Sequence, residues 1–434
     1  MGSVSCVQDI QRWLIMFAVG VLTALVACSI DISIEMLAKI KYGLLRQWTD
    51  HCVEGGWLGP RGGSSDISIS DENSCLYIPY LMWVGLNVIP VTLGSFLVAY
   101  VEPVAGGSGI PQVKCYLNGV KVPRVVRIKT LLCKAVGVIL SVLGGLAVGK
   151  EGPMIHSGAV IAAGISQGKS TSLNIDTKTL PFFRQDREKR DFVSGGAAAG
   201  VAAAFGAPVG GVLFSLEEGA SFWDQALTWR IFLGSMTSYF TLNMVLSVFK
   251  GIPGQLSNGG LLNFGSFENA TYEVWELPLF LLIGALGGVL GALFNHMNYK
   301  LTIFRMRYIT ARPAQMLEAM IVAAVTATMG FLMIYLISDC KPYGNDPTDN
   351  PIQMYCNDGE YHVLGAIWFQ TPEQSVRSLL HDPPGSHRLS TLGLFFMVYY
   401  LLCCWTYGEP PCPSLSQQPP QDSPCPVASS SPPS

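Results

Sequence analysis

The sequence predicts an all-α, polytopic membrane protein whose helices are short, broken and in part re-entrant. Of its 434 residues, 50% are hydrophobic and 13% are charged, about half the charged fraction of a soluble domain. The chain also holds 46 glycines without a collagen-like period. That composition is typical of membrane helices that pack closely or are interrupted within the bilayer.

The composition argues against several other classes. A net charge of −3 does not favour nucleic-acid binding. No constellation of nucleophile, metal ligands or phosphate-binding loop occurs, so we predict no enzyme activity, no bound metal and no cofactor. The apolar run near the N-terminus is not followed by a small-residue cleavage site, and we predict no cleaved signal peptide.

We divide the chain by its apolar runs. The division is a short cytosolic N-terminus (1–9), a first transmembrane repeat (10–249), a luminal linker (250–276), a partial second repeat (277–408) and a disordered Pro/Ser-rich tail (409–434). Apolar spans are expected at about 10–33, 80–101, 131–148, 229–249, 277–294, 314–337 and 392–404. The tail cannot bury enough apolar surface to become ordered.

Charge and cysteine positions suggest an orientation. Residues 114–129 hold five basic residues and no acid, which places this segment in the cytosol by the positive-inside rule. The loop 338–388 would then be luminal, where Cys340 and Cys356 could pair in an oxidising compartment. Asn269 begins an N-glycosylation sequon, a weak signal that counts only if its loop is luminal.

The most informative stretch is Gly149–Pro153, in which Glu151 stands between two glycines beside a proline. Pro in a first turn and Gly at a close approach predict a helix entry, and the N-terminus of a helix attracts anions. A carboxylate here could occupy an anion position and act as a gate, or it could simply face solvent on a capped helix. His156, one turn later, is interpreted as a packed histidine rather than a proton relay.

Two other motifs bracket this one along the chain. Gly107–Pro111 places Ser108 between helix breakers, as an anion ligand or a plain N-cap. Glu217 and Glu218 follow an apolar segment. Ionisable groups inside a membrane are costly and usually functional, although a salt bridge at the membrane edge would also explain this pair.

These three motifs, in this order, resemble those of the CLC family of chloride channels and chloride/proton exchangers. Flanking segments resemble the lysosomal branch of that family, namely 192–194, 196–208, 212–223 and 381–386. The similarity covers about residues 8–408. It implies a fold of two inverted repeats with broken helices, and voltage-gated chloride transport by secondary active chloride/proton antiport in lysosomal or late-endosomal membranes.

The resemblance also implies roles for individual residues. Glu151 would be the gating glutamate, and Glu218 the proton-transfer glutamate, a position that is apolar in channel members. The expected chloride-binding residues are Ser108, Gly109, Ile110, Lys150 and Gly152. Partners implied are membrane lipid, a second copy in a homodimer, and a glycosylated single-pass accessory subunit on the luminal side.

The sequence departs from the family pattern after Gly408. No Gly-x-Phe-x-Pro motif, late tyrosine or nucleotide-sensing domains follow, and the N-terminal tail is short. We therefore expect a truncated form that does not transport chloride alone. A chloride channel of the same fold and a non-transporting variant or regulatory subunit are the alternatives.

Overall fold

The computed structural model is almost entirely helical. It describes residues 2–53, 77–120, 122–170, 172, 175–176, 181–219, 224–254, 261, 273–337, 339–342, 356, 360–381 and 387–407. Asn269, the tail 409–434 and most of the linker 250–276 lie outside the described residues, as do the predictions made for them.

The first part of the chain forms helices joined by short 3₁₀ and π-helical turns and one small β-hairpin. Its elements are α1 (Gly2–Val53), α3 (Tyr77–Phe96), a π-helical turn (Leu97–Val101), a 3₁₀ turn η2 (Pro103–Ala105), α4 (Ile110–Leu117), α5 (Ile128–Leu143), α6 (Glu151–Gln167), the hairpin β1 (Lys169–Ser170) and β2 (Ile175–Asp176), a 3₁₀ turn η3 (Phe182–Arg184), α7 (Asp186–Phe205), α8 (Pro208–Phe214), the π-helix η4 (Ser215–Gly219) and α9 (Gln225–Phe249).

The second part begins with two long helices. Its elements are a 3₁₀ turn η5 (Val274–Glu276), α10 (Leu277–Tyr308), α11 (Arg312–Leu336), the hairpin β3 (Cys340–Pro342) and β4 (Glu360–His362), α12 (Val363–Trp368), α13 (Pro372–His381) and α14 (Leu389–Tyr407).

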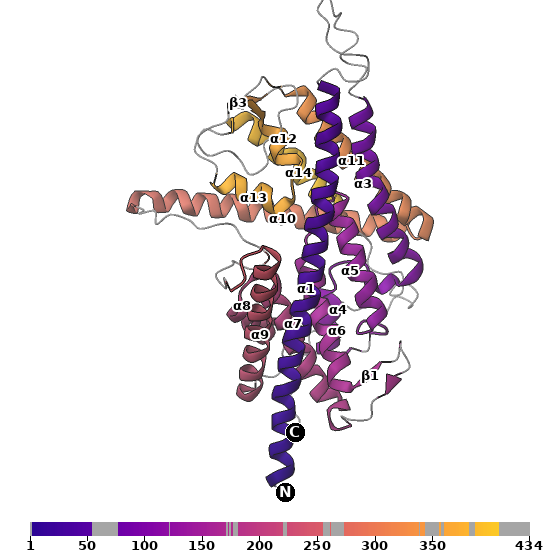
Figure 1. Ribbon diagram of the computed structural model, residues 1–434, viewed down its shortest axis with the longest axis vertical. Helices are drawn as coiled ribbons and strands as arrows, with labels where there is room; N and C mark the ends of the chain where they lie inside the picture. The colour runs from indigo at the N-terminus through magenta and orange to yellow at the C-terminus, as the bar shows by residue number, and fades with distance from the viewer. Residues whose placement is uncertain are drawn as a thin grey trace, which may run out of the picture.

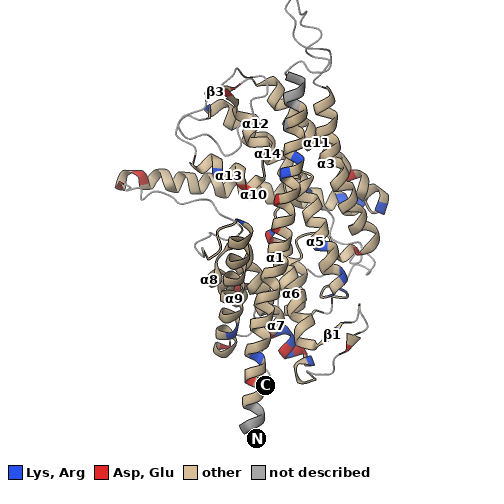
Figure 2. Ribbon diagram, in the orientation of Figure 1, with Lys and Arg blue, Asp and Glu red and all other residues tan. Residues whose placement is uncertain are grey.

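Six described helical stretches are long and apolar enough to cross a membrane. They are Cys6–Leu45, Tyr77–Val101, Gln225–Phe249, Val274–Tyr308, Arg312–Leu336 and Leu389–Tyr407. Charged residues lie at the free end of α10 and near the N-terminus of α1, and others lie along the middle of α1 (Figure 2).

Helix α1 runs along most of the length of the molecule, and α6, α7 and α9 pack against it (Figure 1). One face carries small and branched apolar residues that are buried against α6, α7 and α9, including Ala24, Cys28 and Ile30. At the end near the N-terminus, Arg12 contacts both carboxylate oxygens of Glu188 on α7, at 3.1 and 2.6 Å. This ion pair fixes α1 against the start of α7.

Helices α6 and α7 cross at a point where only glycine fits. A Cβ on Gly158 would lie 2.1 Å from the carbonyl oxygen of Gly196, and a Cβ on Gly196 would lie 2.3 Å from the carbonyl oxygen of Gly158. Small-residue surfaces allow helix backbones to approach this closely in membranes. The glycine- and alanine-rich run after residue 194 is therefore the contact surface that positions α6.

Two predicted spans have different ends in the structure, for local reasons. The predicted span 131–148 ends at Leu143, because Gly144 and Gly145 follow and Gly145 has φ +70°, a conformation that ends helices. The span predicted to end at 294 continues to Tyr308, since no Gly or Pro interrupts the sequence between them.

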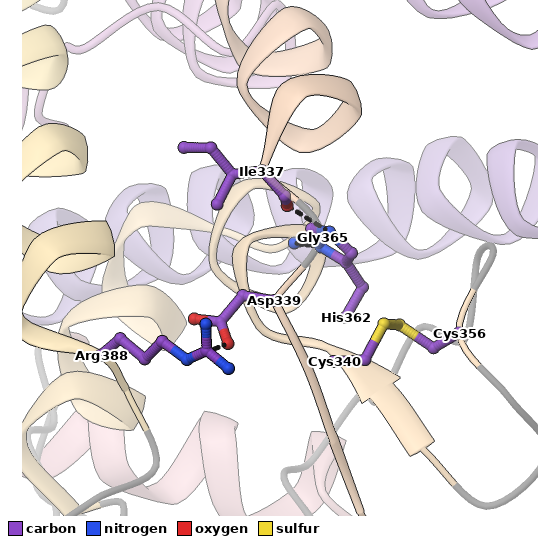
Figure 3. The surroundings of a disulfide bond; sticks show 7 residues. All are labelled: Ile337, Asp339, Cys340, Cys356, His362, Gly365 and Arg388. Carbon is purple, nitrogen blue, oxygen red and sulfur yellow. Dashed lines mark hydrogen bonds and ion pairs between the residues drawn. A yellow bond between two sulfur atoms is a disulfide. The ribbon is translucent and has the colours of Figure 1, made fainter.

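The described residues of the segment predicted as a loop at 338–388 form regular elements. It contains the β3–β4 hairpin, α12 and the amphipathic α13, and a disulfide joins Cys340 to Cys356 (Figure 3). His362 caps α12, because its Nδ1 accepts the N–H of Gly365 at 2.9 Å, and its Nε2 lies 3.0 Å from the carbonyl oxygen of Ile337.

Candidate functional site

The start of α4 is shaped by two glycines on either side of Ser108. Gly107 has φ +70° and Gly109 has φ +83°, left-handed conformations that other residues adopt only with strain. Gly109 is the N-cap of α4, and Pro111 lies in the first turn. Ser108 is thus held immediately before a helix N-terminus, where free N–H groups gather.

The start of α6 lies directly against Ser108. A Cβ on Gly152 would lie 2.8 Å from the Cβ of Ser108 and 3.4 Å from its carbonyl oxygen. Gly152 is therefore the residue that allows the two backbones to meet. The structure brings the Ser108 motif and the Glu151 motif together, so the N-termini of α4 and α6 converge on one place that favours an anion.

Glu151 is the first residue of α6 and is half-buried. Its side chain folds back over Gly149, because a Cβ on Gly149 would lie 2.0 Å from Glu151 Oε2. The carboxylate consequently stays next to the helix entry rather than extending into solvent. It can compete with a free anion for the N-terminal end of α6.

Lys150 is buried, with 6% of its side chain exposed, and two carboxylates hold its ammonium group. One is Asp31 on α1, and the other is Glu373 on α13, at 2.6 Å. Lys150 was expected to bind chloride, and neither acid was predicted to contact it. Nothing in the sequence could place them there, since they lie about 120 residues before and 220 residues after Lys150.

A second buried cation lies beneath the Ser108 turn. Lys134 on α5 and His156 on α6 are 3% and 0% exposed, and Lys134 Nζ lies 2.7 Å from His156 Nδ1. An ammonium group can only donate, so Nδ1 accepts and the Nε2–H of His156 donates to the Val125 carbonyl at 3.0 Å. A Cβ on Gly109 would lie 2.5 Å from Lys134 Nζ, which brings this charge next to the start of α4. His156 is a packed, hydrogen-bonded residue, and Lys134 was not identified from the sequence.

Glu217 and Glu218 lie on the π-helix η4, which packs against α4, α7 and α8. The side chain of Glu217 is exposed, and that of Glu218 lies outside the described side chains. π-helical turns are frequent at functional sites. This one places the backbone of the Glu217–Glu218 pair beside the helix that Ser108 precedes. Among the described residues, no cluster of three or more His, Cys, Asp or Glu side chains is placed to hold a metal ion.

The fold and this site define a helical, multi-pass membrane protein in which broken helices direct their N-termini toward an anion position. Residues 90–411 match the family model described as voltage gated chloride channel. The chain belongs to this family.

Curated relatives include exchangers and channels. The chain is 57% identical over 402 residues to "H(+)/Cl(-) exchange transporter 7" of Bos taurus and of Homo sapiens, covering 92% of this chain and 48% of each relative. It is 34% identical over 408 residues to "Chloride channel protein C" of Dictyostelium discoideum, covering 92% of this chain and 51% of that relative. The chain thus spans about half the length of these relatives.

Solved structures of the same fold are similar at lower sequence identity. The model superimposes on a slow cyanobacterial Cl−/H+ antiporter with a TM-score of 0.61 at 22% identity, covering 92% of this chain and 73% of that one. A eukaryotic CLC transporter gives a TM-score of 0.59 at 22% identity, covering 94% and 58%. The predicted all-α fold of the CLC type is therefore confirmed.

Proposed function

We propose that this chain supplies the Glu151 gate and the Ser108 anion site of a voltage-gated, secondary active chloride/proton antiporter. The observation that carries the proposal is the contact between Gly152 and Ser108, because it places a tethered carboxylate at the meeting point of two helix N-termini. The 57% identity to "H(+)/Cl(-) exchange transporter 7" supports exchange rather than channel activity.

In this mechanism Glu151 and chloride compete for one position. The deprotonated carboxylate occupies the N-terminal end of α6 and blocks chloride. When the carboxylate takes up one proton, it loses its charge and leaves, and chloride then binds beside Ser108. When the carboxylate returns to the N-terminal end of α6, it releases its proton and displaces the bound chloride. Chloride and protons therefore move in opposite directions across the membrane.

We assign the transfer of protons toward the other side of the membrane to Glu218. Its support is its place on η4, which follows the apolar helix α8 and packs against α4. Ionisable groups within membrane segments are costly and are usually functional. In a channel of the same fold this carboxylate would not be needed.

The test is a chimera in which residues 8–407 replace the equivalent part of the Bos taurus relative, reconstituted in liposomes. We expect chloride flux coupled to opposite proton flux, with coupling lost in Glu151→Ala and proton flux lost in Glu218→Ala. Chloride flux without proton movement would establish a channel instead. Absence of any chloride flux from a folded chimera would overturn the proposal.

We further propose that the full assembly resides in lysosomal or late-endosomal membranes as a homodimer, with a glycosylated single-pass subunit bound at the luminal loop. The support is the likeness to the lysosomal branch and the folded segment around the Cys340–Cys356 disulfide. Purification of the chimera from lysosomes, followed by mass measurement of the complex, would test both statements.

A further inference from the structure

The ion pairs of Lys150 join three distant parts of the chain into one charged group. We call Asp31, Lys150 and Glu373 the Lys150 cluster. Asp31 comes from α1, Lys150 is the N-cap of α6, and Glu373 lies in the first turn of α13. Both acids contact the same ammonium nitrogen, and Glu373 Oε1 does so at 2.6 Å.

The Lys150 cluster carries one negative charge in excess, since it contains two carboxylates and one ammonium group. Excess negative charge in a partly desolvated site favours the uptake of a proton. The side chains of Lys150, Asp31 and Glu373 are 6%, 18% and 34% exposed. Glu373 is therefore the member that meets water, and it is the one that can exchange a proton with solution.

The surroundings of Glu373 agree with this assignment. Burial raises the pKa of Glu373 above its ordinary value, the positive charge of Lys150 opposes that rise, and the charges of Asp31 and Glu151 add to it. Glu151 directly follows Lys150 in the chain, so its carboxylate belongs to the same group of charges as Glu373. These charged groups come from α1, the N-cap of α6 and the first residue of α6.

We propose that Glu373 is a proton-exchange residue that takes protons from solution and passes them to Glu151. The inference depends on the proposed role of Glu151 as a proton-carrying gate. A proton binds the Glu373 carboxylate, leaves it for the Glu151 carboxylate, and Glu373 returns to its charged form. Both side chains are partly exposed, and Glu373 contacts the ammonium group of Lys150, the residue directly before Glu151.

Asp31 serves as the second counter-ion of Lys150, a role different from that of Glu373. When Glu373 is protonated, Lys150 still has Asp31 as a full counter-ion, so the buried ammonium never remains unpaired. An unpaired buried charge is strongly destabilising. The second acid therefore allows Glu373 to change charge without disturbing the start of α6, and a lysine with only one acid could not do this.

The experiment uses the full 434-residue chain in lipid nanodiscs and infrared difference spectroscopy of carboxyl groups. The Glu373 band is assigned by its loss in Glu373→Gln, and the Glu151 band by its loss in Glu151→Gln. We expect the titration midpoint of Glu373 to fall in Glu151→Gln and in Asp31→Asn, and to rise in Lys150→Met. After a drop in pH, the Glu151 band should appear at least fivefold more slowly in Glu373→Gln.

Two further variants complete the design. Glu373→Asp retains a carboxyl group and should restore most of the rate at which the Glu151 band appears. Glu360 is a half-buried acid on β4, and Glu360→Gln should change neither that rate nor the titration midpoint of Glu373. An unchanged Glu373 midpoint in Glu151→Gln, or an unchanged Glu151 rate in Glu373→Gln, would overturn the inference. Neither readout requires transport, so failure of the antiport proposal would appear separately, in the chimera.

Discussion

At the scale of single residues, a buried cation, Lys134, lies beside the proposed anion position, and the sequence motifs do not predict it. Lys134 lies in an ordinary apolar helix, yet its ammonium group packs against Gly109 beside the proposed anion position. His156 holds it there from α6. A nearby unit charge contributes on the order of a few kcal/mol at an effective dielectric constant of about 20. Lys134 can therefore favour chloride without touching it.

We predict that Lys134→Met weakens chloride binding at least about tenfold, which corresponds to about 1.4 kcal/mol. The measurement is isothermal titration of chloride into the chimera that carries residues 8–407. Lys129→Met is the matched control, because Lys129 lies on the same helix but is exposed. Equal affinities in the two variants would show that the buried charge does not act on the anion site.

At the scale of elements, the position of Glu151 depends on how closely α6 approaches α7. The contact between Gly158 and Gly196 is made by backbone atoms, which cannot move aside as a flexible side chain would. Any side chain at this point must separate the two helices, and the start of α6 would move with them.

We therefore predict opposite effects for two alanine substitutions in α6. Gly158→Ala should lower stability by about 1–3 kcal/mol, as overpacking does, whereas Gly164→Ala should be neutral or raise stability, by up to about 1 kcal/mol, because nothing lies within 4 Å of its Cβ and alanine favours helix. Thermal unfolding of the detergent-solubilised chain compares them. Equal melting temperatures would contradict the backbone contact.

The cap of α12 makes a second element sensitive to conditions. His362 is fully buried and accepts the Gly365 N–H through Nδ1 (Figure 3), so it must be neutral to act as a cap. Burial lowers the pKa of His362 below its ordinary 6.5. The unfolded segment therefore binds more protons than the folded one below that pH, and the stabilisation is lost as the pH falls from 6.5 through the folded pKa.

We predict that the start of α12 opens more readily as the pH is lowered below 6.5. Hydrogen exchange of the Val363–Gly365 amides, corrected for intrinsic rates, measures this opening. In His362→Gln the dependence on pH should disappear, and the segment should be less protected at neutral pH by about 1 kcal/mol, the usual cost of a lost cap. His296→Gln, at an exposed histidine of α10, should leave the profile unchanged.

At the scale of the whole molecule, the sequence predicts those features that depend on residues close together along the chain. The helix entries at Gly109 and Glu151 follow from glycine and proline chemistry, and the spans follow from apolar runs. That Ser108 and Gly152 belong to one site was implied only by the resemblance to a family, and their contact was not predicted. The partners of Lys150 could not be predicted, because Asp31 and Glu373 meet it only after α1, α6 and α13 have packed together. The folded loop was missed because α13 is short and amphipathic, and apolar runs do not reveal it.

The two ends of the molecule differ in a way that indicates its orientation. One end carries the chain N-terminus and the Arg12–Glu188 ion pair, and the other carries β3 with the Cys340–Cys356 disulfide (Figure 1). Basic segments remain in the cytosol, and disulfides persist in oxidising compartments. From the basic segment 114–129 and the disulfide we therefore expect the disulfide to lie in the lumen and the chain N-terminus in the cytosol.

Native cysteines allow this orientation to be measured without new labels. The span Cys6–Leu45 has 40 residues and a length of about 60 Å at about 1.5 Å per residue, twice the roughly 30 Å of bilayer hydrocarbon. Exposed Cys6 should therefore reach water on the cytosolic side.

In sealed vesicles of known orientation, a membrane-impermeant maleimide should label Cys6 only from the cytosolic face, and an impermeant reductant should open the Cys340–Cys356 bond only from the luminal face. Cys6→Ser and Cys340→Ser identify the two signals. Reaction of both from one face would contradict the arrangement, since five of the six spans, an odd number, separate Cys6 from Cys340.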